Sequence, residues 1–163
     1  YNGKGPAEVG TEFYLGIYGN QLYIPIVNHE PEMNKLVLTD YERDGDVWAD
    51  NCNEIFLQLE GEANYFQFVV GAGGHVFDAI NDPTPGAAVW DSDFKSAVHR
   101  AADGWTTEVL IPLDMFEREV KAGDRLRVNI TRNSPIHAEL SQWSHTYQLG
   151  NHQPKFFGTA VIE

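Results

Sequence analysis

The chain is poor in cysteine, in basic residues and in long apolar runs. Cys52 is its single cysteine among 163 residues, which excludes an intramolecular disulfide. No stretch approaches the roughly 18 consecutive apolar residues that a membrane-spanning helix needs. Lys and Arg number 11 against 24 Asp and Glu, and the formal net charge is −13. Because so acidic a chain repels nucleic acid and anionic membranes, we expect neither as a partner.

Signatures of common catalytic sites are also missing. No Gly-x-Ser-x-Gly motif marks a serine nucleophile. The histidines show no close pair at zinc-site spacing, although His137, His145 and His152 share one long loop. The glycine-rich stretch at 71–74 precedes a strand, so it offers no helix N-terminus for phosphate. No spacing among the acids singles out a glycosidase pair, and we therefore expect a protein that is not an enzyme.

What the chain does have is apolar alternation with a period of two, which is typical of β-strands. Leu126, Val128 and Ile130, for example, alternate with polar residues. Similar runs cover 13–18, 22–26, 36–38, 55–59, 65–70, 95–101, 105–111 and 157–161. Turn-forming residues separate these runs at short intervals.

This pattern predicts an all-β fold. We expect an antiparallel β-sandwich of the jelly-roll or immunoglobulin-like kind, with at most one short helix at 113–120. Residues 1–163 should form a single domain, because no repeat or low-complexity linker divides them. Cys52 should begin a strand and face the core, where Trp105 also belongs, and Trp143 should pack against the sandwich. The long loops at 80–94 and 134–156 are the expected places for recognition.

The most informative segment runs from Trp48 to Leu59, where an aromatic side chain and several acidic and amide groups lead into a strand. Trp48 and Trp90 lie in polar loops, and an exposed tryptophan is costly unless it binds something. Covering one face of roughly 150 Å² would contribute on the order of 3 kcal/mol. A polyhydroxylated ligand such as a sugar suits this arrangement, with micromolar to millimolar affinity.

An acidic stretch offers candidate oxygen ligands for calcium. Asp40, Asp44 and Asp46 lie close together around a glycine, like the front half of a calcium-binding loop. Asn51 stands where a helix-loop-helix site would have its glutamate, so that kind of site is not predicted. We expect a structural calcium site here, with a solvated turn as the alternative, and no catalytic cofactor.

Several segments follow one another in a characteristic order. They are Leu22-Tyr-Ile24, Trp48 with Asn53-Glu-Ile-Phe-Leu57, Tyr65-Phe-Gln-Phe68, Gly104-Trp-Thr-Thr-Glu-Val-Leu-Ile-Pro112, Gly123-Asp with Arg127-Val-Asn129-Ile, and Trp143-Ser with Phe157-Gly158. In order and spacing they resemble the family 9 carbohydrate-binding modules, a β-sandwich family related to DOMON domains. The resemblance covers residues 21–163.

The resemblance implies a non-catalytic module that binds an oligo- or polysaccharide, often with structural calcium. Such modules usually sit beside a covalently linked catalytic domain in an exported bacterial enzyme. From this we expect a secreted, periplasmic or cell-surface location. The chain begins at Tyr1 and shows no signal peptide, so we expect it to be a processed piece of a longer protein.

The resemblance also suggests which residues contact the ligand. In the best-known type two tryptophans clamp the sugar; Trp48 matches the first, and Glu54 matches an acidic contact. The position of the second tryptophan reads Asn151-His152, and the expected basic contact falls on Val69. The candidate ligand-binding residues are Trp48, Glu54, Tyr147, Gln148, Asn151 and His152.

Two alternative functions stay open. Some DOMON relatives bind haem through methionine and histidine, and Met33 and His152 are the candidates here. A purely structural or docking sandwich inside a larger enzyme is the other alternative.

Overall fold

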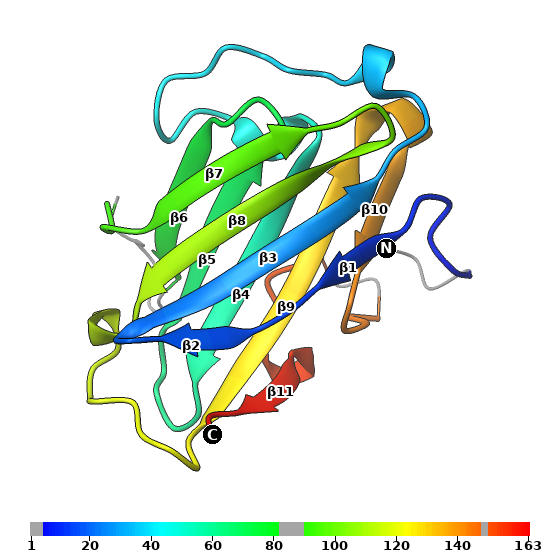
Figure 1. The fold of residues 1–163 in the computed structure, drawn as a ribbon. Helices are drawn as coiled ribbons and strands as arrows, with labels where there is room; N and C mark the ends of the chain where they lie inside the picture. The colour runs from blue at the N-terminus through cyan, green and yellow to red at the C-terminus, as the bar shows by residue number, and fades with distance from the viewer. Residues whose placement is uncertain (1–4, 82–89, 148–149) are drawn as a thin grey trace.

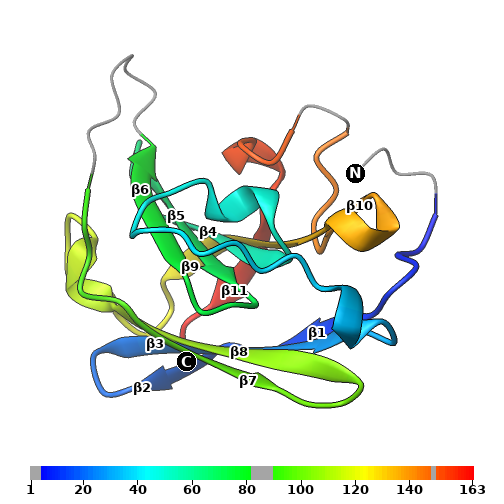
Figure 2. The ribbon, with the colours of Figure 1, turned by 90° about the horizontal axis from the view of Figure 1, so that it is seen from above.

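Two antiparallel sheets pack face to face in the computed structural model, which describes residues 5–81, 90–147 and 150–163 (Figures 1 and 2). All strand pairings are antiparallel. The β-sandwich expected from the alternating sequence is confirmed.

The first sheet has the order β1-β3-β8-β7, and β2 also pairs with β3. Its strands are β1 (Thr11–Phe13), β2 (Gly16–Tyr18), β3 (Gln21–His29), β7 (Lys95–Arg100) and β8 (Gly104–Pro112). The second sheet has the order β10-β9-β4-β5-β6, and β11 also pairs with β9. Its strands are β4 (Cys52–Leu59), β5 (Tyr65–Gly71), β6 (Val76–Asn81), β9 (Arg125–Ser134), β10 (Glu139–Gln142) and β11 (Gly158–Val161).

Helical structure is limited to single 3₁₀ turns in the described residues. They are η1 (Met33–Lys35), η2 (Val47–Ala49), η3 (Leu113–Met115), η4 (Pro135–His137) and η5 (Pro154–Phe156). The helix expected at 113–120 is reduced to η3, because Phe116 takes an extended conformation (φ −75°, ψ 154°) and is itself buried. None of the described helices has the length and apolar character needed to cross a membrane.

The two inner sheet faces form one apolar core. Along β3 the side chains alternate, so that Leu22, Ile24 and Ile26 point at the second sheet and are buried. Burying each such side chain contributes about 1.5–3 kcal/mol. The other buried core residues are Ile55, Leu57, Leu59, Phe66, Phe68, Val70, Phe94, Val109, Ile111, Leu113, Phe116, Leu126, Val128 and Ile130.

The tryptophans and the cysteine only partly follow the expectations. Trp105 is buried, as predicted, and Cys52 begins β4 fully buried, although in a separate small cluster on the outer face of the second sheet. Trp143 packs edge-on against Phe13 but remains 51% exposed. The grouping of Trp90 with exposed tryptophans is wrong, because its ring packs on Phe66 in the core, 5.1 Å between centroids.

A polar contact between the sheets orients β4. The side-chain amides of Asn28 and Asn53 donate to each other's oxygens at 2.9 Å, and Thr107 also donates to Asn53. Asn53 therefore faces inward, and because side chains alternate along a strand, Glu54 faces outward. Figure 2 shows η2 and η5 on this outer side of the second sheet, away from the first sheet.

Gly104 at the start of β8 packs directly against the backbone of β3. A Cβ there would lie 2.1 Å from the carbonyl oxygen of Asn28. We expect Gly104→Ala to lower the free energy of unfolding by about 2 kcal/mol, because β8 and β3 would have to move apart to make room for the added methyl group. Urea unfolding measures the change. Gly16→Ala is the control, because its Cβ would meet nothing within 4 Å; equal stability of both variants would contradict this prediction.

Candidate functional site

An open pocket of about 470 Å³ lies on the outer face of the second sheet. Its lining comes from η2, from the strands β4, β5, β6, β9 and β10 of this sheet, and from the segment after β10. The described lining residues are Trp48, Glu54, Gln67, Phe77, Asn133, Leu140, Gly150, Asn151 and His152. Four of the residues predicted to contact the ligand are thus brought together, although they are up to 104 positions apart (152 − 48).

Trp48 forms an aromatic wall of the pocket. It belongs to η2, whose Val47 is buried against the sheet and so anchors the turn. The indole packs edge-on against Phe77, with ring centroids 5.0 Å apart and planes at 82°. The Asn133 side chain donates to the Trp48 carbonyl at 2.8 Å. Phe77 thus holds the ring and Asn133 the backbone, yet Trp48 remains 41% exposed, which confirms the expectation of an accessible ring.

Glu54 supplies a carboxylate at the base of the pocket. The residue is 5% exposed. Gln67 and Asn151 each donate to it at 2.8 Å, and Thr131 donates at 3.3 Å. Burial raises the pKa of the Glu54 carboxyl, and the three hydrogen bonds oppose that shift. No Lys, Arg or His of the described chain forms an ion pair with Glu54, so amide and hydroxyl groups alone compensate its charge.

His152 lies at the position of the missing second tryptophan. Its Nδ1 and the Tyr65 hydroxyl are hydrogen-bonded at 2.8 Å, and its ring packs edge-on against Phe56 at 5.3 Å. His152 is exposed overall, but these rings partly shield its imidazole from water and so lower its pKa, and burial raises the pKa of Tyr65 to about 12. The imidazole is therefore neutral near pH 7. It contacts Tyr65 and Phe56 rather than Met33 of η1, so these contacts lend the haem alternative no support.

Two of the predicted ligand-binding residues are not part of the described pocket. Tyr147 is 63% exposed and packs against Phe156, with ring centroids 4.9 Å apart and planes at 58°, but it is absent from the lining. Gln148 falls outside the described residues. A contact between either residue and a ligand stays a prediction.

Other lining residues were missed by the sequence analysis. Phe77, Asn133 and Leu140 belong to β6, β9 and β10, and Gln67 belongs to β5. Each is an isolated residue in its own strand, and only the pairing of the strands brings it beside Glu54. The sequence could have shown that these residues lie at outward-facing positions of their strands. It could not show that they lie side by side, because the register between the strands was unknown.

The three predicted calcium ligands have different surroundings. Asp40 faces His75, with a carboxylate oxygen 3.5 Å from Nε2. Asp46 is exposed just before η2. Asp44 alone joins a group of carboxylates that could hold a metal ion, and its companions there are Asp78 and Asp91. Calcium binding to the acidic stretch stays a prediction. The carboxylates that converge in the structure are those of Asp44, Asp78 and Asp91, not those of the three predicted ligands.

Arg43 already lies among these converging carboxylates. The oxygens of Asp44, Asp78 and Asp91 lie within 4.8 Å of one another. The Arg43 Nε is 3.0 Å from Asp91 and 3.6 Å from Asp44, and its Nη2 donates to the buried Asp78. A calcium ion would have to displace this guanidinium, so the residues as placed do not fit a metal ion.

Removing the guanidinium should expose the three carboxylates to metal. We expect calcium to raise the melting temperature of Arg43→Ala by about 3 °C or more, and to change that of the wild type much less. Thermal unfolding in calcium and in chelator measures both shifts. Arg100→Ala removes an exposed arginine at the end of β7 and serves as the control. Identical calcium shifts in all three proteins would refute the role given to Arg43.

Comparisons with known proteins identify the fold. No family model matches the chain, and no curated protein matches it in sequence. A protein from Bacteroides uniformis ATCC 8492 with a proposed carbohydrate-binding role superposes with a TM-score of 0.81 and 18% identity, over 97% of this chain and 80% of that one. A family 9 carbohydrate-binding module from Caldicellulosiruptor kristjanssonii was solved with glucose and with cellotriose.

The glucose complex superposes with a TM-score of 0.69 and 15% identity, over 98% of this chain and 80% of that one. The cellotriose complex superposes with a TM-score of 0.68 and 16% identity, over 98% of this chain and 78% of that one. The chain therefore has the fold of the family 9 carbohydrate-binding modules, and the resemblance seen in its sequence is confirmed.

Proposed function

We propose that this protein is a non-catalytic carbohydrate-binding module that holds an oligo- or polysaccharide in the pocket beside Trp48. The observation that carries the proposal is the pairing of an exposed indole with a hydrogen-bonded carboxylate, Glu54, in one pocket. The shared fold supports it, since the similar family 9 module was solved with glucose and with cellotriose.

The chemistry of a sugar matches these two groups. A pyranose ring has an apolar face of C–H groups that can cover an indole, and covering it would contribute on the order of 3 kcal/mol. The hydroxyls at the ring edge can donate to the Glu54 carboxylate. Glu54 is also the single carboxylate among the described lining residues, whereas glycoside hydrolysis uses a pair. The pocket therefore suits binding rather than cleavage.

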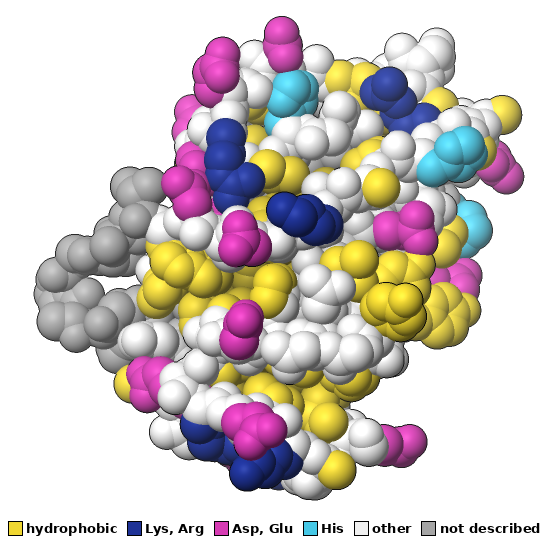
Figure 3. All heavy atoms as spheres, turned by 60° about the vertical axis from the view of Figure 1, so that its left-hand side comes forward, with side chains coloured by type: hydrophobic (Ala, Val, Ile, Leu, Met, Phe, Trp, Pro, Cys, Tyr) yellow, Lys and Arg dark blue, Asp and Glu magenta, His cyan; other side chains and the backbone are white. Residues whose placement is uncertain are grey.

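The setting of this module is also part of the proposal. We infer from the family resemblance that residues 1–163 form one module, linked to a catalytic domain of an exported bacterial enzyme that acts on polysaccharide. On the face drawn in Figure 3, acidic side chains are spread among apolar patches and a few basic ones. A spread negative surface is compatible with neutral glycans, which carry no charge to be repelled.

Calorimetry over a panel of neutral oligosaccharides tests the proposal. We expect at least one β-linked glucan or xylan fragment to bind with micromolar to millimolar affinity. A panel without any binding, in a protein shown to be folded, would overturn the assignment and leave the structural or docking sandwich as the better interpretation.

Binding of a neutral sugar should weaken in acid. Sugar hydroxyls donate to the ionised form of Glu54, so affinity is full above the raised pKa of this carboxyl and falls as pH drops through it. We expect a loss of about tenfold, the scale of one charge-assisted hydrogen bond. Titrations at several pH values measure it. His152 also titrates in acid because its pKa is lowered; a fall in affinity that persists in Glu54→Gln would assign the effect to His152.

A further inference from the structure

The amide side chains of the pocket direct N–H groups at acceptors of the protein. Gln67 and Asn151 each donate to Glu54 at 2.8 Å. Asn133 donates to the carbonyls of Trp48 and Asp50, at 2.8 and 3.2 Å. Carboxylates and backbone carbonyls can only accept, so these contacts fix which end of each amide faces the protein. Asn133 thus makes two such contacts, and Gln67 and Asn151 each direct one N–H at Glu54.

One oxygen of these amides is a buried acceptor without a partner. The Oδ1 of Asn151 is enclosed and receives no hydrogen bond from any described residue. An unpaired buried acceptor costs free energy that a donor on a ligand would recover. It lies on the same side chain whose Nδ2 bonds Glu54, so the unmet acceptor and the carboxylate are adjacent.

The pocket also has negative charge without a nearby cation. Glu54 is buried, and none of the described lining residues is Lys or Arg. The partly exposed indole of Trp48 lines the same pocket, and aromatic faces attract cations. The net charge of −13 adds a long-range attraction for positively charged ligands.

We propose that this pocket prefers a glycan carrying a protonated amino group, such as a glucosamine unit, over the corresponding neutral or N-acetylated sugar. The inference rests on the proposed function, because it concerns the sugar held in that same site. An ammonium group has three donors and no acceptor, which complements Glu54 and the free oxygen of Asn151. An N-acetyl group removes the charge, and with it the attraction of the amino group to the Glu54 carboxylate.

Three disaccharides that differ only at C2 test the preference. Cellobiose has a hydroxyl, chitobiose in its fully deacetylated form has an amine, and diacetylchitobiose has an acetamide, all with the same β-1,4 linkage. At about pH 7 an amine with a pKa near 8 is mostly protonated. We expect the deacetylated disaccharide to bind about tenfold more tightly than cellobiose, and the acetylated one no more tightly than cellobiose.

Two matched changes locate the source of the preference. In Glu54→Gln the tenfold preference should disappear, whereas Asp114→Asn, which removes an exposed charge in η3 outside the pocket, should keep it. At about pH 9 the wild type should lose its preference as well, because the amine loses its proton while Glu54 stays ionised. This second measurement needs no variant and so does not depend on how Glu54→Gln folds.

The outcomes separate this inference from the proposed function. Equal affinities for the three disaccharides, or an amine preference that survives both Glu54→Gln and about pH 9, would overturn the inference and leave a neutral-sugar module. If none of the three disaccharides binds and no neutral glycan of the panel binds either, the proposed function is overturned and the inference with it.

Discussion

Trp48→Ala is expected to weaken glycan binding by about 100-fold. The exposed indole lines the pocket, and losing roughly 3 kcal/mol of apolar contact corresponds to about two powers of ten in affinity. The fold should survive, because the ring is 41% exposed and its main partner in the protein is the edge contact with Phe77. Calorimetry with the best ligand of the neutral panel measures the loss.

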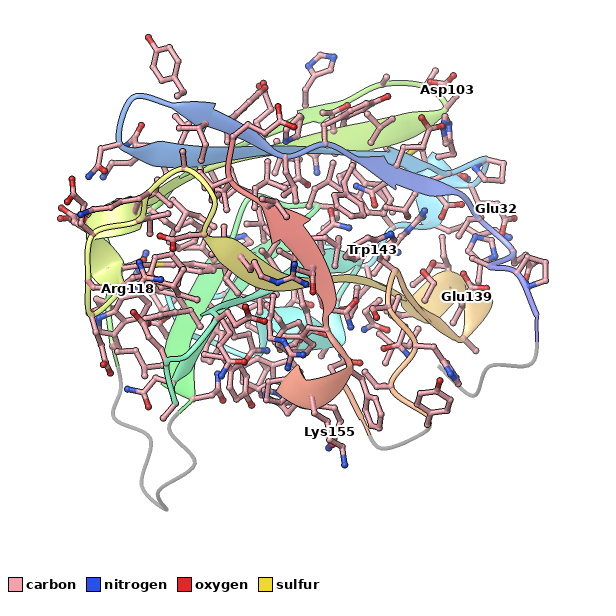
Figure 4. All side chains as sticks on the ribbon, turned by 90° about the horizontal axis from the view of Figure 1, so that it is seen from below. Glu32, Asp103, Arg118, Glu139, Trp143 and Lys155 are labelled. Carbon is pink, nitrogen blue, oxygen red and sulfur yellow. The ribbon has the colours of Figure 1, made fainter. Side chains whose placement is uncertain are left out.

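Trp143 provides the matched control. It is 51% exposed, slightly more than Trp48, and packs against Phe13 and beside Gly158 of β11, outside the pocket (Figure 4). Trp143→Ala should therefore leave affinity within about twofold of the wild type, since it removes no ligand contact. If the two variants bound equally well, or if Trp143→Ala were the weaker one, the pocket beside Trp48 would not be the binding site.

Arg132→Ala is expected to cause the largest loss of stability, about 3–5 kcal/mol. The guanidinium is 1% exposed and lies over the Trp105 ring, 4.5 Å from its centroid. It donates to the His29 carbonyl at 2.9 Å and to a carboxylate oxygen of Glu30 at 2.9 Å. Glu30 is fully buried, so removing Arg132 leaves a carboxylate enclosed without its main countercharge.

A double variant separates the lost ion pair from lost packing. In Glu30→Gln with Arg132→Met both charges are gone and volume is kept, so we expect most of the stability to return. His137 also bonds Glu30, at 2.9 Å, and this contact raises the pKa of His137. Its contribution is present at acid pH and is lost as pH rises through that raised pKa. Urea unfolding that shows a smaller cost for Arg132→Ala than for the double variant would contradict this account.

The sequence was sufficient to predict the fold because the alternation is so regular. Leu22, Ile24 and Ile26 show the inward face of β3 without any knowledge of its partners. The same local information fails for Trp90, whose neighbours in sequence are polar but whose ring reaches back onto Phe66. Whether a loop side chain is buried depends on the course of the loop in three dimensions, and the local sequence pattern does not determine that course.

The candidate site likewise contains residues that the sequence predicts and residues that only the structure reveals. Trp48 and Glu54 could be predicted because the family resemblance includes the short segment that contains both, and the structure places both in one pocket. Asn133 and Phe77 reach the pocket only through the pairing of four strands, and no local signal marks them. The carboxylates of Asp78 and Asp91 likewise meet Asp44 through tertiary structure. Residues that strand register brings to the site can therefore be identified only from the three-dimensional structure.

The central claim is that the exposed indole and the buried carboxylate hold one sugar between them. A crystal structure of the protein with a bound neutral oligosaccharide of the panel tests it most directly. The account predicts a pyranose ring lying over Trp48, with a hydroxyl about 2.6–3.0 Å from a Glu54 oxygen. An oligosaccharide seated elsewhere, for instance against Trp143, with the pocket beside Trp48 holding only solvent, would contradict it.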